Sequence, residues 1–267
     1  KLKRKKLLEQ DKIACLEALL QRNREGQSWQ LGSGAEGAVL LGRSVGDGGG
    51  TVASPSRDLV AIKVVPLGSD SREARSELAA EAELLAELTR RSAVGFPRLH
   101  YYGEQSLSFD GKAAASAVLC MELLGPSVED LLWETSDGTC LSHACVLQLG
   151  REALARLQVL HAMGVVHNDC KPSNLCMGLG EHRHRVYLVD FGASSSVASV
   201  TAVAPPAEAE PPTAAHGTPL FASRASHLGG RPTRPEDDLE GLCFTLAYLC
   251  LGNLPWGRSR GAGSPPL

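Results

Sequence analysis

The 267-residue sequence predicts a two-lobed α+β fold, because its strand-like and helix-like segments are separated along the chain. The first part combines short β-branched runs with one strongly helical segment, and the second part is mainly helical. A chain of this length with 43% apolar residues can bury a sizeable core without disulfides or metals. We therefore expect an antiparallel sheet with one helix, followed by a helical lobe.

The first part begins with a basic segment, residues 1–25, whose leucines recur at helical spacing and predict an amphipathic extension. Its Lys/Arg cluster fits a nuclear-import or anionic-surface patch, or simply a solvated helix end. Two strand-like runs follow, AVLLG and LVAIKVV, separated by a Gly/Ser-rich spacer. Residues 72–90 are good helix formers throughout, and the next two runs, joined through Asp110-Gly111, predict a hairpin.

The second part contains two predicted helices and two polar segments. Residues 142–163 place apolar side chains at spacings of three and four, and residues 238–251 read as a helix buried nearly all round. A short strand is predicted at residues 186–192, VYLVDFG. The Ala/Pro/Ser/Glu-rich residues 193–216 and the tail 258–267 are predicted to be disordered.

Composition excludes several classes of function. The net charge of −3 gives no overall attraction to nucleic acid or to an anionic membrane. No apolar run approaches the about 18 residues of a membrane-spanning helix. The eight cysteines lack paired zinc-ribbon spacing and no secretory signal precedes them, which predicts reduced thiols in the cytoplasm or nucleus. We expect a monomer that binds no nucleic acid.

A glycine-rich motif, GSGAEGAV at residues 32–39, points to a phosphate-binding loop through Gly32, Ser33, Gly34 and Gly37. Residues without side chains let backbone N–H groups approach phosphate oxygens closely. The motif alone is a weak signal, since it also fits a dinucleotide fingerprint or a turn without a ligand. A strand and the sequence VAIK follow it instead of a helix, which favours a loop covering nucleotide phosphates.

Lys63, the last residue of VAIK, is the candidate clamp for the nucleotide's α and β phosphates. A lone lysine that ends a strand is ordinarily a solvated edge residue, but here a Glu-bearing helix follows. Glu81 is the preferred ion-pair partner because three leucines then fall at +3, +4 and +7, toward the core. Glu77 and Glu83 are competing partners.

The sequence HNDCKPSN and the later DFG supply groups that phosphoryl transfer requires. Asp169 is the candidate base or orienting group for the attacking hydroxyl, and Lys171 is the candidate cation near the transferred group. Asn174 and Asp190 are the candidate magnesium ligands, because Mg²⁺ prefers oxygen. His167 is interpreted as a packed structural histidine.

These motifs, in this order, resemble those of eukaryotic protein kinases, and within them the casein kinase I family. The segment MELLGPSVEDLL is similar to the hinge of that family, and residues 217–256 are similar to its segment from the end of the activation loop through a buried helix. The usual A-P-E is replaced by ASR, as in that family. The resemblance covers about residues 28–257.

The resemblance implies a bilobal protein-kinase-like fold, with an N-lobe at residues 26–124 and a C-lobe at residues 125–257. It implies an ATP- and Mg²⁺-dependent protein serine/threonine kinase acting on protein substrates; Lys171 and Thr218 favour Ser/Thr over Tyr. Asp238 would brace the catalytic loop. The residues implied around adenine are Met121 as gatekeeper, Glu122 and Leu124 through their backbone, and Val39, Ala61 and Cys176 against the ring; Leu85, His167 and Phe191 would stack as a spine.

Three departures from the kinase pattern bear on function. Asn168 replaces the Arg that pairs with an activation-loop phosphate in many kinases, which predicts activity independent of that phosphorylation. Residues 193–216 contain no Lys or Arg, which argues against a preference for phosphate-primed substrates. The sequence ends soon after LPW, so we expect a C-lobe without its last helices and an apolar patch beside the 238–251 helix.

The sequence also allows two functions other than that of an active protein kinase. A pseudokinase acting as a nucleotide-binding scaffold would follow if the short C-lobe removed activity, although Lys63, Asp169, Asn174 and Asp190 are all retained. A small-molecule phosphotransferase shares an H-x-D-x-x-x-x-N loop, but Lys171 and GTPLFAS speak against it.

Overall fold

The computed structural model divides the chain into two compact units, residues 1–124 and 125–267. It describes residues 30–34, 37–43, 59–68, 72–109, 112–135, 140–197, 217–229 and 233–257. The predictions for residues 1–25, the Gly/Ser-rich spacer, the Asp110-Gly111 turn and the 258–267 tail lie outside these ranges. Most of the predicted disordered segment, residues 198–216, lies outside them as well.

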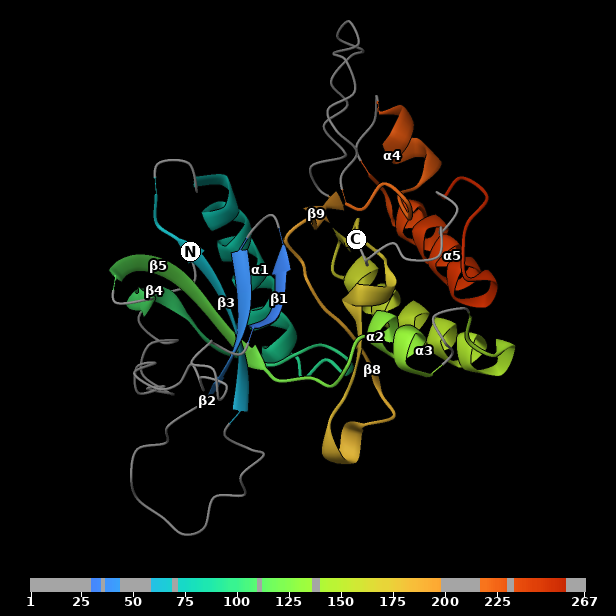
Figure 1. The fold of residues 1–267 in the computed structure, drawn as a ribbon. Helices are drawn as coiled ribbons and strands as arrows, with labels where there is room; N and C mark the ends of the chain where they lie inside the picture. The colour runs from blue at the N-terminus through green and yellow to red at the C-terminus, as the bar shows by residue number, and fades with distance from the viewer. Residues whose placement is uncertain are drawn as a thin grey trace, which may run out of the picture. The chain divides into compact units, whose positions relative to one another are not determined.

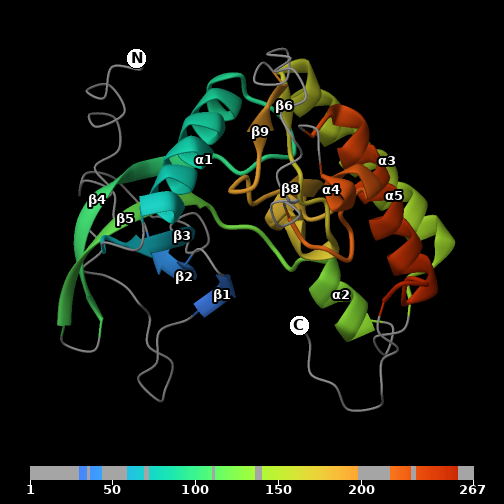
Figure 2. The ribbon, with the colours of Figure 1, turned by 90° about the horizontal axis from the view of Figure 1, so that it is seen from above.

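The first unit is an antiparallel sheet covered by one helix (Figure 1). The strand order is β1-β2-β3-β5-β4, and the strands are β1 (Gln30–Gly34), β2 (Gly37–Arg43), β3 (Leu59–Pro66), β4 (Leu99–Phe109) and β5 (Lys112–Glu122). The helix α1 (Arg72–Arg90) lies along one face of the sheet and contacts β3, β4 and β5 (Figure 2). This is the arrangement predicted from the sequence.

The alternation of side chains along β3 explains how its two faces differ. Successive residues of a strand point to opposite faces. Val60, Ile62 and Val64 join the core cluster on one face, whereas Lys63 faces the other way and meets a side chain of α1. The position that carries the candidate lysine is therefore fixed by the strand's hydrophobic pattern.

The second unit is mainly helical. Its helices are α2 (Val128–Thr135), α3 (His143–Ala162), α4 (Arg224–Leu228) and α5 (Pro235–Leu251), and its short strands pair as β6 (Val165–Val166) with β9 (Ser195–Ser196) and β7 (Leu175–Met177) with β8 (Val186–Leu188). The long helices α3 and α5 run side by side in both views (Figures 1 and 2). Ser142 caps α3 by accepting a hydrogen bond from the Cys145 N–H, 3.3 Å away. The predicted α+β class is confirmed.

Two expectations about the second unit were wrong. The disorder predicted from residue 193 does not hold for its first residues, because Ser195–Ser196 form β9 and pair with β6. The helix α5 is not buried all round: its buried residues recur at spacings of three and four along one face, while Leu239, Cys243 and Leu251 are exposed. Apolar content on both faces had suggested full burial, but only one face packs.

Single large apolar side chains are exposed on the helices of the second unit, whereas the apolar patch expected beside α5 stays a prediction. Leu251 is 70% exposed and Trp256 is 55% exposed, and on α3 Leu147 is 74% exposed. Among the helices in the part of the chain that the structure describes, none has the length and apolar character needed to cross a membrane.

Candidate active site

In the first unit, the candidate phosphate clamp forms a buried ion pair. The Lys63 Nζ lies 3.0 Å from Glu81 Oε2, and the two side chains are 10% and 1% exposed. Glu81 lies on the buried face of α1 with Leu78 and Leu85, whereas Glu83 is exposed. A charge buried this deeply is tolerated only with a partner of opposite sign, so the pair holds α1 and β3 in one arrangement.

The glycine-rich motif is the hairpin of β1 and β2. Gly32 pairs with Val39, Ser33 with Ala38, and Gly34 with Gly37, and the turn residues lie outside the described ranges. A dinucleotide fingerprint would lead from a strand into a helix. The chain instead continues through β2 to β3, where Val39 is the register partner of Lys63. The hairpin therefore fits a loop over nucleotide phosphates.

The candidate adenine contacts of this unit lie where β5 ends. Ala61 of β3 pairs with Met121 of β5. The Glu122 N–H donates to the Arg98 carbonyl at 2.9 Å, so Glu122 can offer adenine its carbonyl but not its N–H. Leu124 is the last residue of the unit.

In the second unit, two side chains and one backbone N–H group converge on the carboxylate of Asp169, a residue that is only 8% exposed. Its Oδ1 accepts a hydrogen bond from the Thr218 N–H at 2.8 Å, and its Oδ2 accepts one from Asn174 Nδ2 at 3.0 Å. Lys171 Nζ lies 2.7 Å from Oδ2 and donates to Thr218 Oγ1 at 2.9 Å. The sequence had marked Thr218 only as a sign of Ser/Thr specificity; its contacts with both Asp169 and Lys171 were not foreseen.

Asn174 has one amide atom left for a cation. It lies in a 3-10 turn, Pro172–Asn174, and its Nδ2 donates both to the Asp169 backbone carbonyl at 2.9 Å and to the carboxylate. Because the nitrogen is used in this way, the amide oxygen is the atom that could bind a metal. The Val189 N–H donates to the Asn174 carbonyl at 3.0 Å, which ties this turn to the residue that precedes Asp190.

The donor set fits magnesium. An amide oxygen of Asn174 and a carboxylate of Asp190 are hard oxygen ligands. Among the described residues no group of three or more His, Cys, Asp or Glu side chains could hold a metal. Mg²⁺ is commonly bound by one or two protein carboxylates together with substrate phosphates, so a site made by Asn174 and Asp190 with the nucleotide stays the prediction.

Asp190 has an unusual backbone conformation, with φ at 64°. Non-glycine residues with positive φ are uncommon and cluster at functional sites, where surrounding structure holds them. The strand predicted at residues 186–192 is shorter than expected: β8 stops at Leu188, two residues before Asp190.

Asp238 of α5 braces the loop that carries these residues. Its fully buried carboxylate accepts hydrogen bonds from the backbone N–H groups of His167 at 2.8 Å and Asn168 at 2.7 Å, and His161 Nε2 lies 2.8 Å from it. Thr245 Oγ1 adds a bond of 2.7 Å to the Cys170 carbonyl. One helix therefore holds the backbone of this loop at three residues, His167, Asn168 and Cys170.

His167 is a packing residue in this arrangement. Its Nδ1 accepts from the Asp169 N–H at 3.3 Å, which leaves Nε2 to donate to the Val189 carbonyl at 3.1 Å and assigns the neutral Nε2–H tautomer. Its ring meets Phe191 edge to face, with centroids 5.3 Å apart. Leu85 is fully buried in the first unit, and its stacking on these two rings stays a prediction.

Cys176 of β7 presents a neutral sulfur. Burial, with a smaller contribution from Asp130, raises the pKa of its thiol to about 12. Its backbone bridges to Ser127. A thiol with this pKa remains protonated at neutral pH and behaves as a small apolar group, as a contact with an adenine ring requires.

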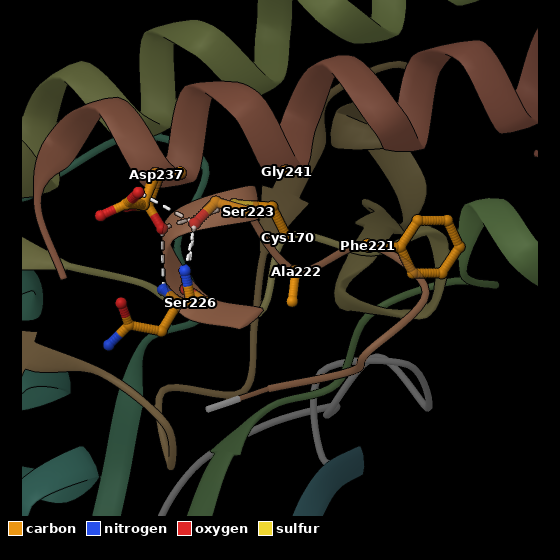
Figure 3. Close-up of a pocket in the computed structure, with 9 residues that line it drawn as sticks. Cys170, Phe221, Ala222, Ser223, Ser226, Asp237 and Gly241 are labelled. Atoms are coloured by element: carbon orange, nitrogen blue, oxygen red, sulfur yellow. Dashed lines mark hydrogen bonds between the residues drawn. The ribbon is translucent and has the colours of Figure 1, made fainter. Parts of the chain in front are cut away.

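The serine of the sequence ASR, Ser223, has a structural role beside a small pocket of the second unit. The Ser223 hydroxyl caps α4 by accepting from the Ser226 N–H at 3.1 Å, and it donates to Asp237 Oδ1 of α5 at 2.9 Å (Figure 3). The pocket beside them has room for about one water molecule, which is too small for a nucleotide. Ser223 therefore ties the end of the 217–223 segment to α5.

Comparisons with known proteins agree with this geometry. Residues 27–264 match the family model described as protein kinase domain. The chain belongs to the protein kinase family. It is similar to a casein kinase 1-like protein, HD16, of Oryza sativa subsp. japonica, with 32% identity over 234 residues; the match covers 87% of this chain and 31% of that relative. The kinase domain thus spans about a third of the length of the curated relative it matches, and the resemblance to casein kinase I-like proteins is confirmed.

Proposed function

We propose that this kinase domain transfers the γ-phosphate of ATP to Ser or Thr hydroxyls of protein substrates, and that it does so without phosphorylation of its own activation segment. The observation that carries the proposal is the cluster around Asp169, with Lys171, Asn174 and Thr218 in contact with it or with each other. Residues 26–124 and 125–257 are the two lobes of this proposal.

The geometry of Asp169 supports a role in orienting the substrate hydroxyl. A carboxylate has about four acceptor positions, and donors from Thr218, Asn174 and Lys171 occupy three of them. The remaining position can accept the proton of a substrate hydroxyl. Because the three donors come from the protein itself, the carboxylate is oriented before the substrate binds.

Lys171 and Lys63 are proposed to act on the phosphates. Lys171 carries its charge beside the carboxylate that would hold the acceptor hydroxyl, where negative charge is transferred. Lys63 is held by Glu81 on β3 and would contact the α and β phosphates. Magnesium bound by Asn174 and Asp190 would neutralise charge on the phosphates.

Two observations favour a protein kinase over the alternatives. Thr218, which belongs to the sequence GTPLFAS, takes part in the cluster through its hydrogen bond with Lys171. That sequence belongs to the protein kinase pattern rather than to small-molecule phosphotransferases. The ion pair of Lys63 and Glu81 is intact, as are Asp169 and Asn174, whereas a scaffold without activity has no need of these groups together.

The test uses the whole chain after phosphatase treatment, with casein, ATP and Mg²⁺. We expect phosphate on Ser and Thr residues, identified by mass spectrometry, and a rate unchanged by the phosphatase treatment. Transfer confined to Tyr would overturn the assignment of specificity. Activity that appears only after phosphorylation of the activation segment would overturn the independence.

A further inference from the structure

We propose that Asn168 is a positioning residue: its carboxamide holds the segment that follows Asp190 through Ala193 and Ser195, using neutral hydrogen bonds where an arginine would use a phosphate. The effect on turnover rests on the proposed function, but the effect on the segment does not. All residues of this contact lie in the second unit.

The contact consists of two hydrogen bonds from one nitrogen. Asn168 Nδ2 donates to the Ala193 carbonyl at 2.8 Å and to Ser195 Oγ at 3.0 Å. A carbonyl only accepts, so the atom facing Ala193 must be the amide nitrogen. Among the described residues no donor reaches Asn168 Oδ1. The side chain therefore acts on this segment as a donor.

The residues that Asn168 holds lie directly after the proposed metal ligand. Ala193 is three positions beyond Asp190, and the Ser194 N–H and hydroxyl both bond to the Phe191 carbonyl, at 3.0 and 2.7 Å. Ser195 begins β9, which pairs with β6, and the Val197 N–H donates to the Gly164 carbonyl at 2.7 Å. The segment from Asp190 to Val197 is thus held by a series of short-range hydrogen bonds and by its pairing with β6.

Asn168 can hold the 190–197 segment because its own backbone is fixed. Its N–H donates to the buried carboxylate of Asp238 at 2.7 Å. Its φ is 68°, a left-handed conformation in which Asn is several-fold enriched over most residues. An arginine at this position would meet that backbone conformation with a larger penalty.

The groups around the Asn168 side chain suit an uncharged donor. Nδ2 meets a carbonyl and a hydroxyl, and the Ser195 hydroxyl in turn lies 3.1 Å from Thr233 Oγ1. None of these groups carries a charge. A guanidinium placed here would need an anion such as a phosphate to balance it, whereas the carboxamide is satisfied by the unmodified segment.

The experiment compares Asn168→Gly and Asn168→Asp with the parent chain. Glycine accepts φ 68° without strain and removes the carboxamide; aspartate keeps the shape and the tolerance of this conformation but has no donor when ionised. Ser92→Gly is the matched control, because Ser92 is an exposed residue of the first unit with φ 53°. Ser195→Ala removes one of the two acceptors.

We expect both Asn168 variants to lose about 5- to 100-fold of the hydrogen-exchange protection of the Ser194 and Val197 amides, since each of the two neutral bonds lost is worth a factor of about two to ten. Ser195→Ala gives a smaller loss, and Ser92→Gly gives none. In turnover assays kcat falls roughly 10- to 100-fold, while the KM for ATP changes less than about threefold. If Asn168 had a purely structural role, the variants would instead lose hydrogen-exchange protection throughout the second unit.

Each result decides the matter. Unchanged exchange at residues 194–197 in Asn168→Gly or in Ser195→Ala overturns the proposal, and Ser195→Ala keeps the test decisive if the Asn168 variants fail to fold. If the parent chain transfers no phosphate, the proposed function fails, and the exchange data alone decide whether Asn168 holds the segment. Lost protection with unchanged kcat overturns the positioning role.

Discussion

Asp238→Asn is the substitution whose effect the structure defines most closely. The Asp238 carboxylate is fully buried and accepts two backbone N–H groups of the catalytic loop, one on each oxygen. Asparagine keeps the size of the side chain but offers one oxygen and one NH₂ group. Whichever way the amide turns, an N–H of the loop faces another N–H.

The expected loss of stability follows from these contacts. A hydrogen bond to a charged acceptor contributes about 1.5–3 kcal/mol, and a buried donor left without a partner costs about 1–3 kcal/mol. The sum, about 2.5–6 kcal/mol, is a large part of the about 5–15 kcal/mol that stabilises a typical domain. Asp238→Asn should therefore destabilise the second unit severely.

Urea unfolding followed by circular dichroism measures this loss, with Glu236→Gln as the matched control. Glu236 is an exposed acidic residue in the first turn of the same helix, where a lost charge costs only about 0.3–1 kcal/mol through the helix dipole. If Asp238→Asn lowers the free energy of unfolding no more than Glu236→Gln does, the account of Asp238 as the brace of the loop is refuted.

Three further predictions concern the site. Lys63→Met and Glu81→Gln should each lower kcat/KM at least about 100-fold. In a double-mutant cycle, the double variant should lose at least about 1 kcal/mol less free energy of unfolding than the two single losses added together; full additivity would contradict the buried pair. Thr218→Val should lower kcat about tenfold by removing the Lys171 partner, while Thr218→Ser keeps it, and equal rates for the two would count against this contact. Burial raises the pKa of Cys120 to about 12 and that of Cys170 well above its ordinary value, so both thiols are almost wholly protonated at pH 8. Iodoacetamide at this pH should therefore label the exposed Cys140, Cys145 and Cys243 first. Early labelling of Cys120 in the native protein would contradict its burial.

Local patterns were sufficient to predict much of the first unit. The leucine spacing in residues 72–90 identified the buried face of α1, and Glu81, which shares that face, is the residue that meets Lys63. The glycine motif was likewise expected to lead into a strand rather than the helix of a dinucleotide fingerprint, and β2 and β3 do follow β1, whereas its role over phosphates stays a prediction. These inferences depend on periodicity within one element, which a sequence displays directly.

Contacts between distant residues could not be predicted in this way. Thr218 reaches Asp169 across 49 residues, and Asn168 reaches Ser195 across 27. The Ala/Pro/Ser/Glu-rich composition of residues 193–216 suggested disorder. Ser195 and Ser196 nevertheless form a strand, because their backbones pair with β6 and because Asn168 donates a hydrogen bond to the Ser195 hydroxyl. Tertiary contacts of this kind leave no periodic signal.

The burial of α5 shows a related limit. Apolar residues on several faces of a helix indicate that it could be buried, but the neighbours that cover each face are set by the rest of the chain. In this structure Leu242, Thr245 and Leu249 pack inward while Leu251 is 70% exposed.

Asp169 and the donors around it are proposed to form a working phosphotransfer site. The most direct test is the kcat for Mg·ATP-dependent phosphorylation of casein by the parent chain and by Asp169→Asn, with ATP binding measured in parallel. We expect measurable turnover by the parent chain and a loss of about 100- to 10,000-fold in the variant, with ATP binding retained. ATP binding by the parent chain without any phosphate transfer, or equal turnover by both proteins, would contradict the proposal.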